Sequence, residues 1–115
     1  HAIEAATEFA IPHGIAVTIG MDMANYVSHS LNIGTKDYFN RMHATLRQNY
    51  QGYEAIPVPI GKFLVAILKD KKNMSSENLT LILPDSDNLM CKMAVPNNQL
   101  FSDTCQNFLT TIRST

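Results

Sequence analysis

Two histidines at the start of the chain carry the side chain that most often binds metal ions in proteins. His1 and His13 are twelve residues apart, and His13 lies between Pro12 and Gly14. A zinc site needs three or four donors, and this spacing matches no compact zinc motif. From the spacing alone, His13 is therefore either a metal ligand or, by default, a histidine that caps a helix or is satisfied within a loop.

Acidic side chains near these histidines are the natural support for such a site. His1, Glu4 and Glu8 follow helical spacing and would share one face, as a site built from carboxylates and histidine requires. A helix face exposed to water has the same pattern, so both interpretations stay open. His29 and His43 have no obvious carboxylate partner in the sequence, and we interpret them as surface or packing residues.

A lysine cluster lies further along the chain, where Lys69, Lys71 and Lys72 surround Asp70. At the C-terminal end of a helix, cations stabilise the helix dipole and need no ligand. Alternatively, one of these lysines binds a phosphate or carboxylate as a point charge. Asp70 would then pair with one lysine and orient another.

The hydrophobic pattern predicts the elements that position these residues. We expect a mainly α fold, a multihelical array of about five helices with one small β-hairpin. Pro12 should end the first helix, Gly34 should follow the second, and Thr35 should cap the third. The second helix is apolar on nearly all sides, which predicts a central, buried position. The expected helices are 1–9, 14–31, 36–50, 60–72 and 98–112, and the expected strands are 79–83 and 89–95.

The length and composition limit the class of protein. A chain of 115 residues forms one domain, and 45% hydrophobic with 17% charged residues is typical of a globular protein. A net charge of -1 gives no electrostatic reason to bind nucleic acid. The sequence has neither an apolar run that could span a membrane nor the features of a signal peptide. We therefore expect a cytoplasmic domain without nucleic-acid or membrane partners.

Three motifs in a fixed order suggest a family. They are His-Ala-Ile-Glu at 1–4, His-Gly-x-Ala-Val-x-Ile-Gly-Met at 13–21, and Asp-Lys-Lys at 70–72. The chain resembles the C-terminal, multihelical half of 3-dehydroquinate synthase and of the wider sugar-phosphate cyclase family. The resemblance extends over nearly the whole chain, because the family also ends with a basic motif, a short hairpin and a last helix.

The resemblance implies a site and its cofactors. Members of this family bind NAD in an N-terminal α/β domain and hold a catalytic zinc in the cleft between the domains. By this likeness His13 is a zinc ligand, His1 is a catalytic residue that contacts substrate near the metal, and Lys71 or Lys72 binds the acidic sugar phosphate. No residue that could cap the first helix precedes His1. We therefore expect 1–115 to be a single C-terminal domain, truncated at its N-terminal edge and without its NAD-binding domain.

The same resemblance implies the reaction, with alternatives. The leading hypothesis is 3-dehydroquinate synthase, a lyase of the shikimate pathway that is active only at full length and that forms homodimers through its other domain. Ile15 stands where dehydroquinate synthases have glutamate, so a cyclase of cyclitol or aminocyclitol biosynthesis is the second hypothesis. Such enzymes make 2-deoxy-scyllo-inosose or 2-epi-5-epi-valiolone. A non-catalytic helical binding module is the third.

Overall fold

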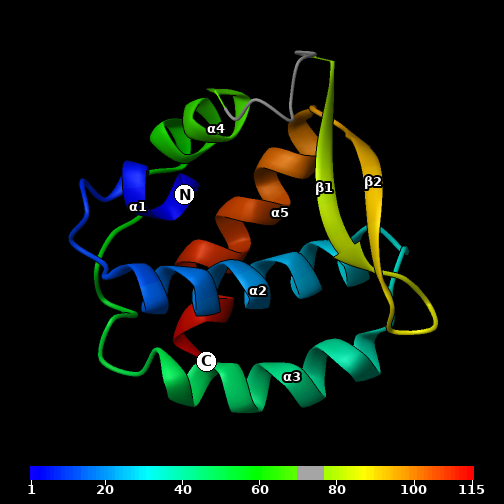
Figure 1. Cartoon of the computed structure of the whole chain (residues 1–115), viewed down its shortest axis with the longest axis horizontal. Helices are drawn as coiled ribbons and strands as arrows, with labels where there is room; N and C mark the ends of the chain where they lie inside the picture. The colour runs from blue at the N-terminus through cyan, green and yellow to red at the C-terminus, as the bar shows by residue number, and fades with distance from the viewer. Residues whose placement is uncertain (70–76) are drawn as a thin grey trace.

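The computed structural model describes residues 1–69 and 77–115, and within these ranges it contains five α-helices and one hairpin (Figure 1). This confirms the predicted mainly α class, and the hairpin lies where the sequence places it. The helices are α1 (Ala2–Ala6), α2 (His13–Ser30), α3 (Lys36–Asn49), α4 (Ile60–Lys69), α5 (Gln99–Thr110) and the short 3-10 helix η1 (Ile112–Ser114), and the strands are β1 (Asn78–Pro84) and β2 (Met90–Pro96).

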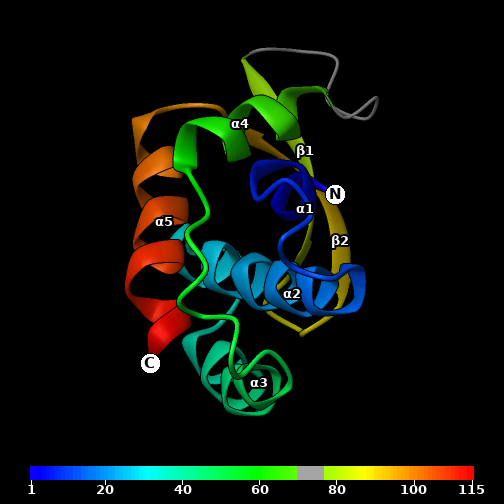
Figure 2. The same ribbon diagram turned by 90° about the vertical axis from the view of Figure 1, so that its left-hand side faces the viewer.

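α2 crosses the middle of the molecule and contacts most of the other elements. α3 runs along one side of α2, while α5, α1 and β1 pack around the rest of it (Figure 1, Figure 2). Ile19, Met23 and Val27 are buried at these contacts. Val17 and Met21, however, are 45% and 49% exposed, so the prediction that α2 is buried on nearly all sides is wrong for this face.

The first helix ends three residues before its predicted end. The amide of Phe9 donates to the carbonyl of Glu4 over 2.9 Å, and the amide of Glu8 donates to that of Ala5 over 3.3 Å. These two bonds form a Schellman ending, in which Glu8 and Phe9 take left-handed φ angles of 52° and 63°. The turn reverses the chain so that Ile11 reaches the core, where it is fully buried. Tertiary burial therefore ends α1 before Pro12 has any effect.

α2 ends with a Schellman turn as well, but Asn32 takes the left-handed position that we predicted for glycine. Its φ angle is 61°, and the amide of Ile33 donates back to the carbonyl of Ser28 over 2.9 Å. Gly34 is required for a different reason, the close packing of its backbone against Ser28 and Pro84. A Cβ at this position would lie 2.6 Å from Ser28 Oγ and 2.8 Å from the carbonyl oxygen of Pro84, so the chain needs glycine for this close approach.

Side-chain caps start two of the helices, and the cap of α3 is the one that the sequence predicts. The hydroxyl of Thr35 accepts a hydrogen bond from the amide of Tyr38 over 3.1 Å and so begins α3. The side-chain oxygen of Asn98 accepts from the amide of Phe101 over 3.0 Å and begins α5. Each cap satisfies an amide that has no partner within its own helix.

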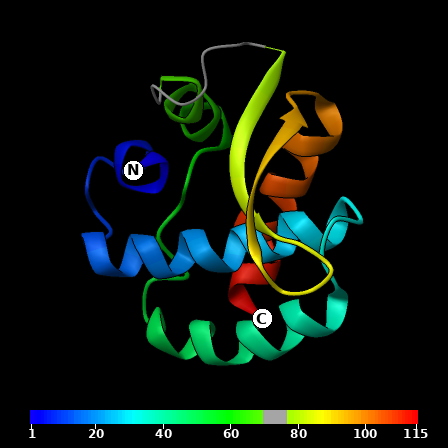
Figure 3. The ribbon, with the colours of Figure 1, turned by 45° about the vertical axis from the view of Figure 1, so that its right-hand side comes forward.

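The hairpin covers one end of the core. β1 and β2 are antiparallel, and their register places Leu79 opposite Val95 and Leu83 opposite Cys91 (Figure 3). Leu79, Leu83 and Val95 are buried, and β1 contacts α2. The alternation of buried and exposed residues follows from the pleat of a strand with one face against the core.

α5 contributes a stripe of three buried side chains to the core. Phe101, Cys105 and Phe108 are all buried. Burial raises the pKa of the Cys105 thiol to about 12, so this cysteine is protonated at neutral pH and serves as a packing residue. Neither α5 nor any other helix in the described ranges is long and apolar enough to cross a membrane.

We predict that Gly34→Ala destabilises the protein by roughly 1–3 kcal/mol, because the new methyl group would overlap Ser28 and the backbone of Pro84. Gly20→Ala is the matched control: a Cβ at Gly20 meets no atom within 4 Å, and alanine favours a helix interior by up to about 1 kcal/mol. Urea denaturation of both variants measures the difference. Equal stabilities would contradict the close contact at Gly34.

Candidate functional site

A carboxylate and a histidine from different helices meet at the start of α2. His13 is the first residue of α2, and its Nδ1 lies 2.9 Å from Oε1 of Glu4 on α1. Glu4 is only 8% exposed, whereas the side chain of His13 is 68% exposed. The Schellman turn after α1 makes the contact possible, since it reverses the chain between the two residues.

His1 lies beside this pair. The ring centres of His1 and His13 are 6.4 Å apart, and the amino group of His1 is 3.8 Å from Oε1 of Glu4. The structure therefore brings the two predicted site histidines together, with a buried carboxylate between them and the core. Their roles in catalysis and metal binding remain predictions.

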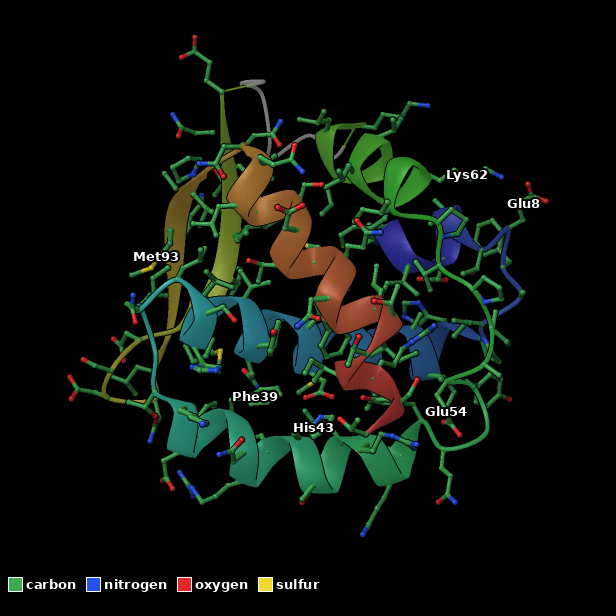
Figure 4. The ribbon with its side chains drawn as sticks, turned by 180° about the vertical axis from the view of Figure 1, so that it is seen from behind. Glu8, Phe39, His43, Glu54, Lys62 and Met93 are labelled. Carbon is green, nitrogen blue, oxygen red and sulfur yellow. The ribbon has the colours of Figure 1, made fainter. Side chains whose placement is uncertain are left out.

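Two other charged groups do not join the site in the way the sequence suggests. Glu8 was expected on the same helix face as Glu4, but it lies beyond the end of α1 and pairs with Lys62 of α4 at 3.4 Å (Figure 4). This exposed pair contributes little to stability. Lys71 and Lys72, the predicted substrate-binding residues, lie outside the described residues.

Two depressions open next to His1. The first has a volume of about 900 Å³ and carries charged side chains on its walls, among them Glu8, Lys62 and Lys69. The second, of about 710 Å³, is mainly apolar and includes the exposed Val17 and Met21 of α2. A polar, acidic ligand would therefore find its cationic partners in the first depression.

The donors at this site fit part of a zinc centre. Because a carboxylate accepts the proton of Nδ1, Nε2 is the ring nitrogen of His13 that can coordinate a metal, as in many zinc proteins. Ile15, in the first turn of α2, packs against the hydrophobic core instead of adding a carboxylate. Among the described residues, no group of three or more His, Cys, Asp and Glu side chains could hold a metal. The described residues thus offer one histidine nitrogen with a carboxylate behind it, not a complete metal site.

A second polar cluster lies between α2 and α3. Asp22 is fully buried, and its Oδ2 accepts a hydrogen bond from the Tyr50 hydroxyl and another from Nδ1 of His43, each over 2.6 Å. His43 also stacks on Phe39 with ring centres 5.1 Å apart, and Figure 4 shows both side chains between the two helices. Our interpretation of His43 as a residue without a carboxylate partner is therefore wrong.

The sequence does contain a signal for this cluster. Asp22 interrupts the apolar run of α2, and a carboxylate in a buried helix requires hydrogen-bond partners. The partners come from α3 and the residue that follows it, 21 and 28 positions away. Helical spacing compares residues on one helix only, so it could not identify them.

The fold and the site define a helical domain in which a carboxylate supports a histidine at the start of the central helix. Residues 1–73 match the family of 3-dehydroquinate synthase C-terminal domains. The chain belongs to this family. No curated protein and no solved structure matches the chain. The matched range ends before the hairpin and α5, so the resemblance of these last elements to the family stays a prediction.

We predict that Asp22→Ala lowers the free energy of unfolding by about 3–5 kcal/mol, because it leaves His43 and Tyr50 without their buried acceptor. Tyr50→Phe removes one hydrogen bond to a charged group and should cost about 1.5–3 kcal/mol. Asp37→Ala is the control, since Asp37 is exposed and pairs with the exposed Arg41, and this substitution should change stability by less than about 0.5 kcal/mol. A cost for Asp22→Ala no larger than for this control would refute the cluster.

Alkaline pH provides a second test of the same contact. Burial raises the pKa of Tyr50 above its ordinary value, and the hydrogen bond and charge of Asp22 raise it further. The unfolded chain therefore releases this proton at a lower pH than the folded chain, so stability falls as pH rises above about 10. We expect Tyr50→Phe to lose less stability than the unchanged protein between about pH 9 and 11, by urea denaturation at each pH. Equal losses would show that Tyr50 ionises normally.

Proposed function

We propose that this chain is the zinc- and substrate-binding C-terminal domain of an NAD-dependent sugar-phosphate cyclase, most simply 3-dehydroquinate synthase. The observation that carries the proposal is the pairing of His13 with Glu4, beside His1, in a chain of this family. The reaction converts a heptulosonate phosphate to dehydroquinate with elimination of phosphate. NAD binds to the N-terminal domain of the full-length, cytoplasmic enzyme, through which two copies form a homodimer.

In this proposal, His13 is a zinc ligand and His1 is the catalytic residue beside it. Nε2 of His13 is the coordinating atom, because Nδ1 is hydrogen-bonded to Glu4. Bound zinc supplies Lewis-acid polarisation of an oxygen at the reacting carbon. The ring centres of His1 and His13 are 6.4 Å apart. In this position the imidazole of His1 contacts the substrate near the metal and exchanges a proton with the substrate.

Two lysines in the first depression support an acidic substrate. Lys62 and Lys69 both line it together with His1, and Glu8, which pairs with Lys62, lines it as well. Lys71 and Lys72 follow in the sequence and are the remaining cations that we propose for substrate binding. A lysine ammonium binds a phosphate or carboxylate as a compact point charge.

Ile15 favours a second candidate, a cyclase that acts on another sugar phosphate in cyclitol or aminocyclitol biosynthesis. The side chain is apolar and packs against the core, so no carboxylate from this position can contact substrate or metal ligands. A sugar phosphate that makes no contact with a carboxylate at position 15 would bind to this site as well as to one with glutamate there. The two candidates share the metal, the cofactor and the proposed roles of His1 and His13, and they differ only in the sugar phosphate.

We predict that the natural gene product containing this domain, supplied with NAD and zinc, releases phosphate from a heptulosonate phosphate. Loss of a hydrogen-bond partner behind a ligand alone costs 10–100-fold, so His13→Ala should reduce the rate by more than about 100-fold. The measurement is phosphate release over time. The control is His29→Gln at the opposite end of α2, which should keep most of the activity.

The outcomes separate the candidates. Release of phosphate from another sugar phosphate only would favour the cyclitol enzymes, while no turnover of any sugar phosphate would favour a non-catalytic binding module. We expect the 115-residue chain alone to be inactive, because its described residues offer a single proposed zinc ligand and the proposed NAD-binding domain is a separate one. Turnover by this chain alone, or full activity of His13→Ala, would overturn the proposal.

A further inference from the structure

Glu4 is unusual among the acidic residues of α1 and its following turn because its carboxylate is buried. Its side chain is 10% exposed, compared with 82% for Glu8 four residues later. A buried carboxylate requires hydrogen-bond donors that compensate for lost hydration. Nδ1 of His13 at 2.9 Å is the side-chain donor that reaches it.

This contact determines which nitrogen of His13 carries the proton. A neutral imidazole has one N–H donor and one acceptor nitrogen, whereas an ionised carboxylate only accepts. The proton must therefore lie on Nδ1, and the lone pair must lie on Nε2. Since the side chain of His13 is 68% exposed, the ring remains accessible beyond the buried contact.

We propose that Glu4 is a positioning residue that holds His13 in the Nδ1–H tautomer and directs the Nε2 lone pair toward a bound metal. Glu4 itself touches neither metal nor substrate. The inference rests on the proposed zinc-binding role of His13, but the tautomer can be measured without any metal. Removal of such a partner weakens metal binding by 10–100-fold in other zinc sites.

The test compares three forms of the 115-residue chain: unchanged, Glu4→Leu and Glu8→Gln. Two-bond proton–nitrogen NMR spectra at about pH 8.5, where histidine is neutral, report the tautomer of His13. We expect Nδ1–H in the unchanged chain and in Glu8→Gln, and a shift toward Nε2–H in Glu4→Leu. Glu8→Gln removes the same charge from an exposed site, so it controls for long-range electrostatics.

A titration of the natural gene product and of its Glu4→Leu and Glu8→Gln variants with Zn²⁺ measures the consequence for metal binding, because the described residues of this chain do not form a complete metal site. Glu4→Leu should weaken the apparent affinity at His13 by about 10-fold or more, while Glu8→Gln should leave it unchanged. Glu4→Gln serves as the second variant if Glu4→Leu fails to fold. Its carbonyl oxygen can still accept from Nδ1, so it should keep the tautomer and lose affinity through the missing charge.

Each result has a defined meaning. An unchanged tautomer in Glu4→Leu, or coordination of Zn²⁺ through Nδ1 in the natural gene product, would overturn the positioning role. A purely structural Glu4 would alter stability without moving the tautomer. If the tautomer shifts as expected but the natural gene product binds no Zn²⁺ at His13, the proposed zinc function fails while the role of Glu4 in orienting the ring stands.

Discussion

The burial of α2 is the constraint on which the rest of the structure depends, because each polar side chain on its inner face needs a partner from another element. Near its C-terminal end, Ser28 donates from Oγ to the carbonyl of Pro84 in β1. In its middle, Asp22 accepts from His43 and Tyr50. At its first residue, the largely exposed ring of His13 donates to the buried carboxylate of Glu4 on α1. Three polar contacts along one helix thus connect α2 to β1, to α3 and to α1, and the last of them is also the candidate site.

Much of the fold follows from patterns that act within a few residues. Thr35 caps α3 where the sequence predicts, because a cap depends on the residue and the next turn alone. Asn98 caps α5 in the same way. The ends of α1 and α2 were harder to predict. The Schellman turn after α1 places Glu8, which is not a glycine, at an unfavourable φ of 52°. The same turn brings Ile11 into the core. That burial depends on the tertiary structure, which no local pattern contains.

The candidate site also combines features that the sequence predicts with contacts that depend on the tertiary structure. The positions of His1 and His13 were predicted by resemblance, and helical spacing placed Glu4 on the face of His1. The contact of Glu4 with His13 depends on the angle between α1 and α2, which a turn of two left-handed residues determines. His43 was misinterpreted for the same reason, since its carboxylate partner lies on another helix.

The proposed function depends most on one bond, in which His13 coordinates zinc through Nε2 while its Nδ1 donates to Glu4. A crystal structure of the zinc-loaded natural gene product tests this most directly. We predict Nε2 of His13 at about 2.0–2.1 Å from the metal, with Glu4 still hydrogen-bonded to Nδ1. Zinc bound at Nδ1, or held without His13, would contradict it.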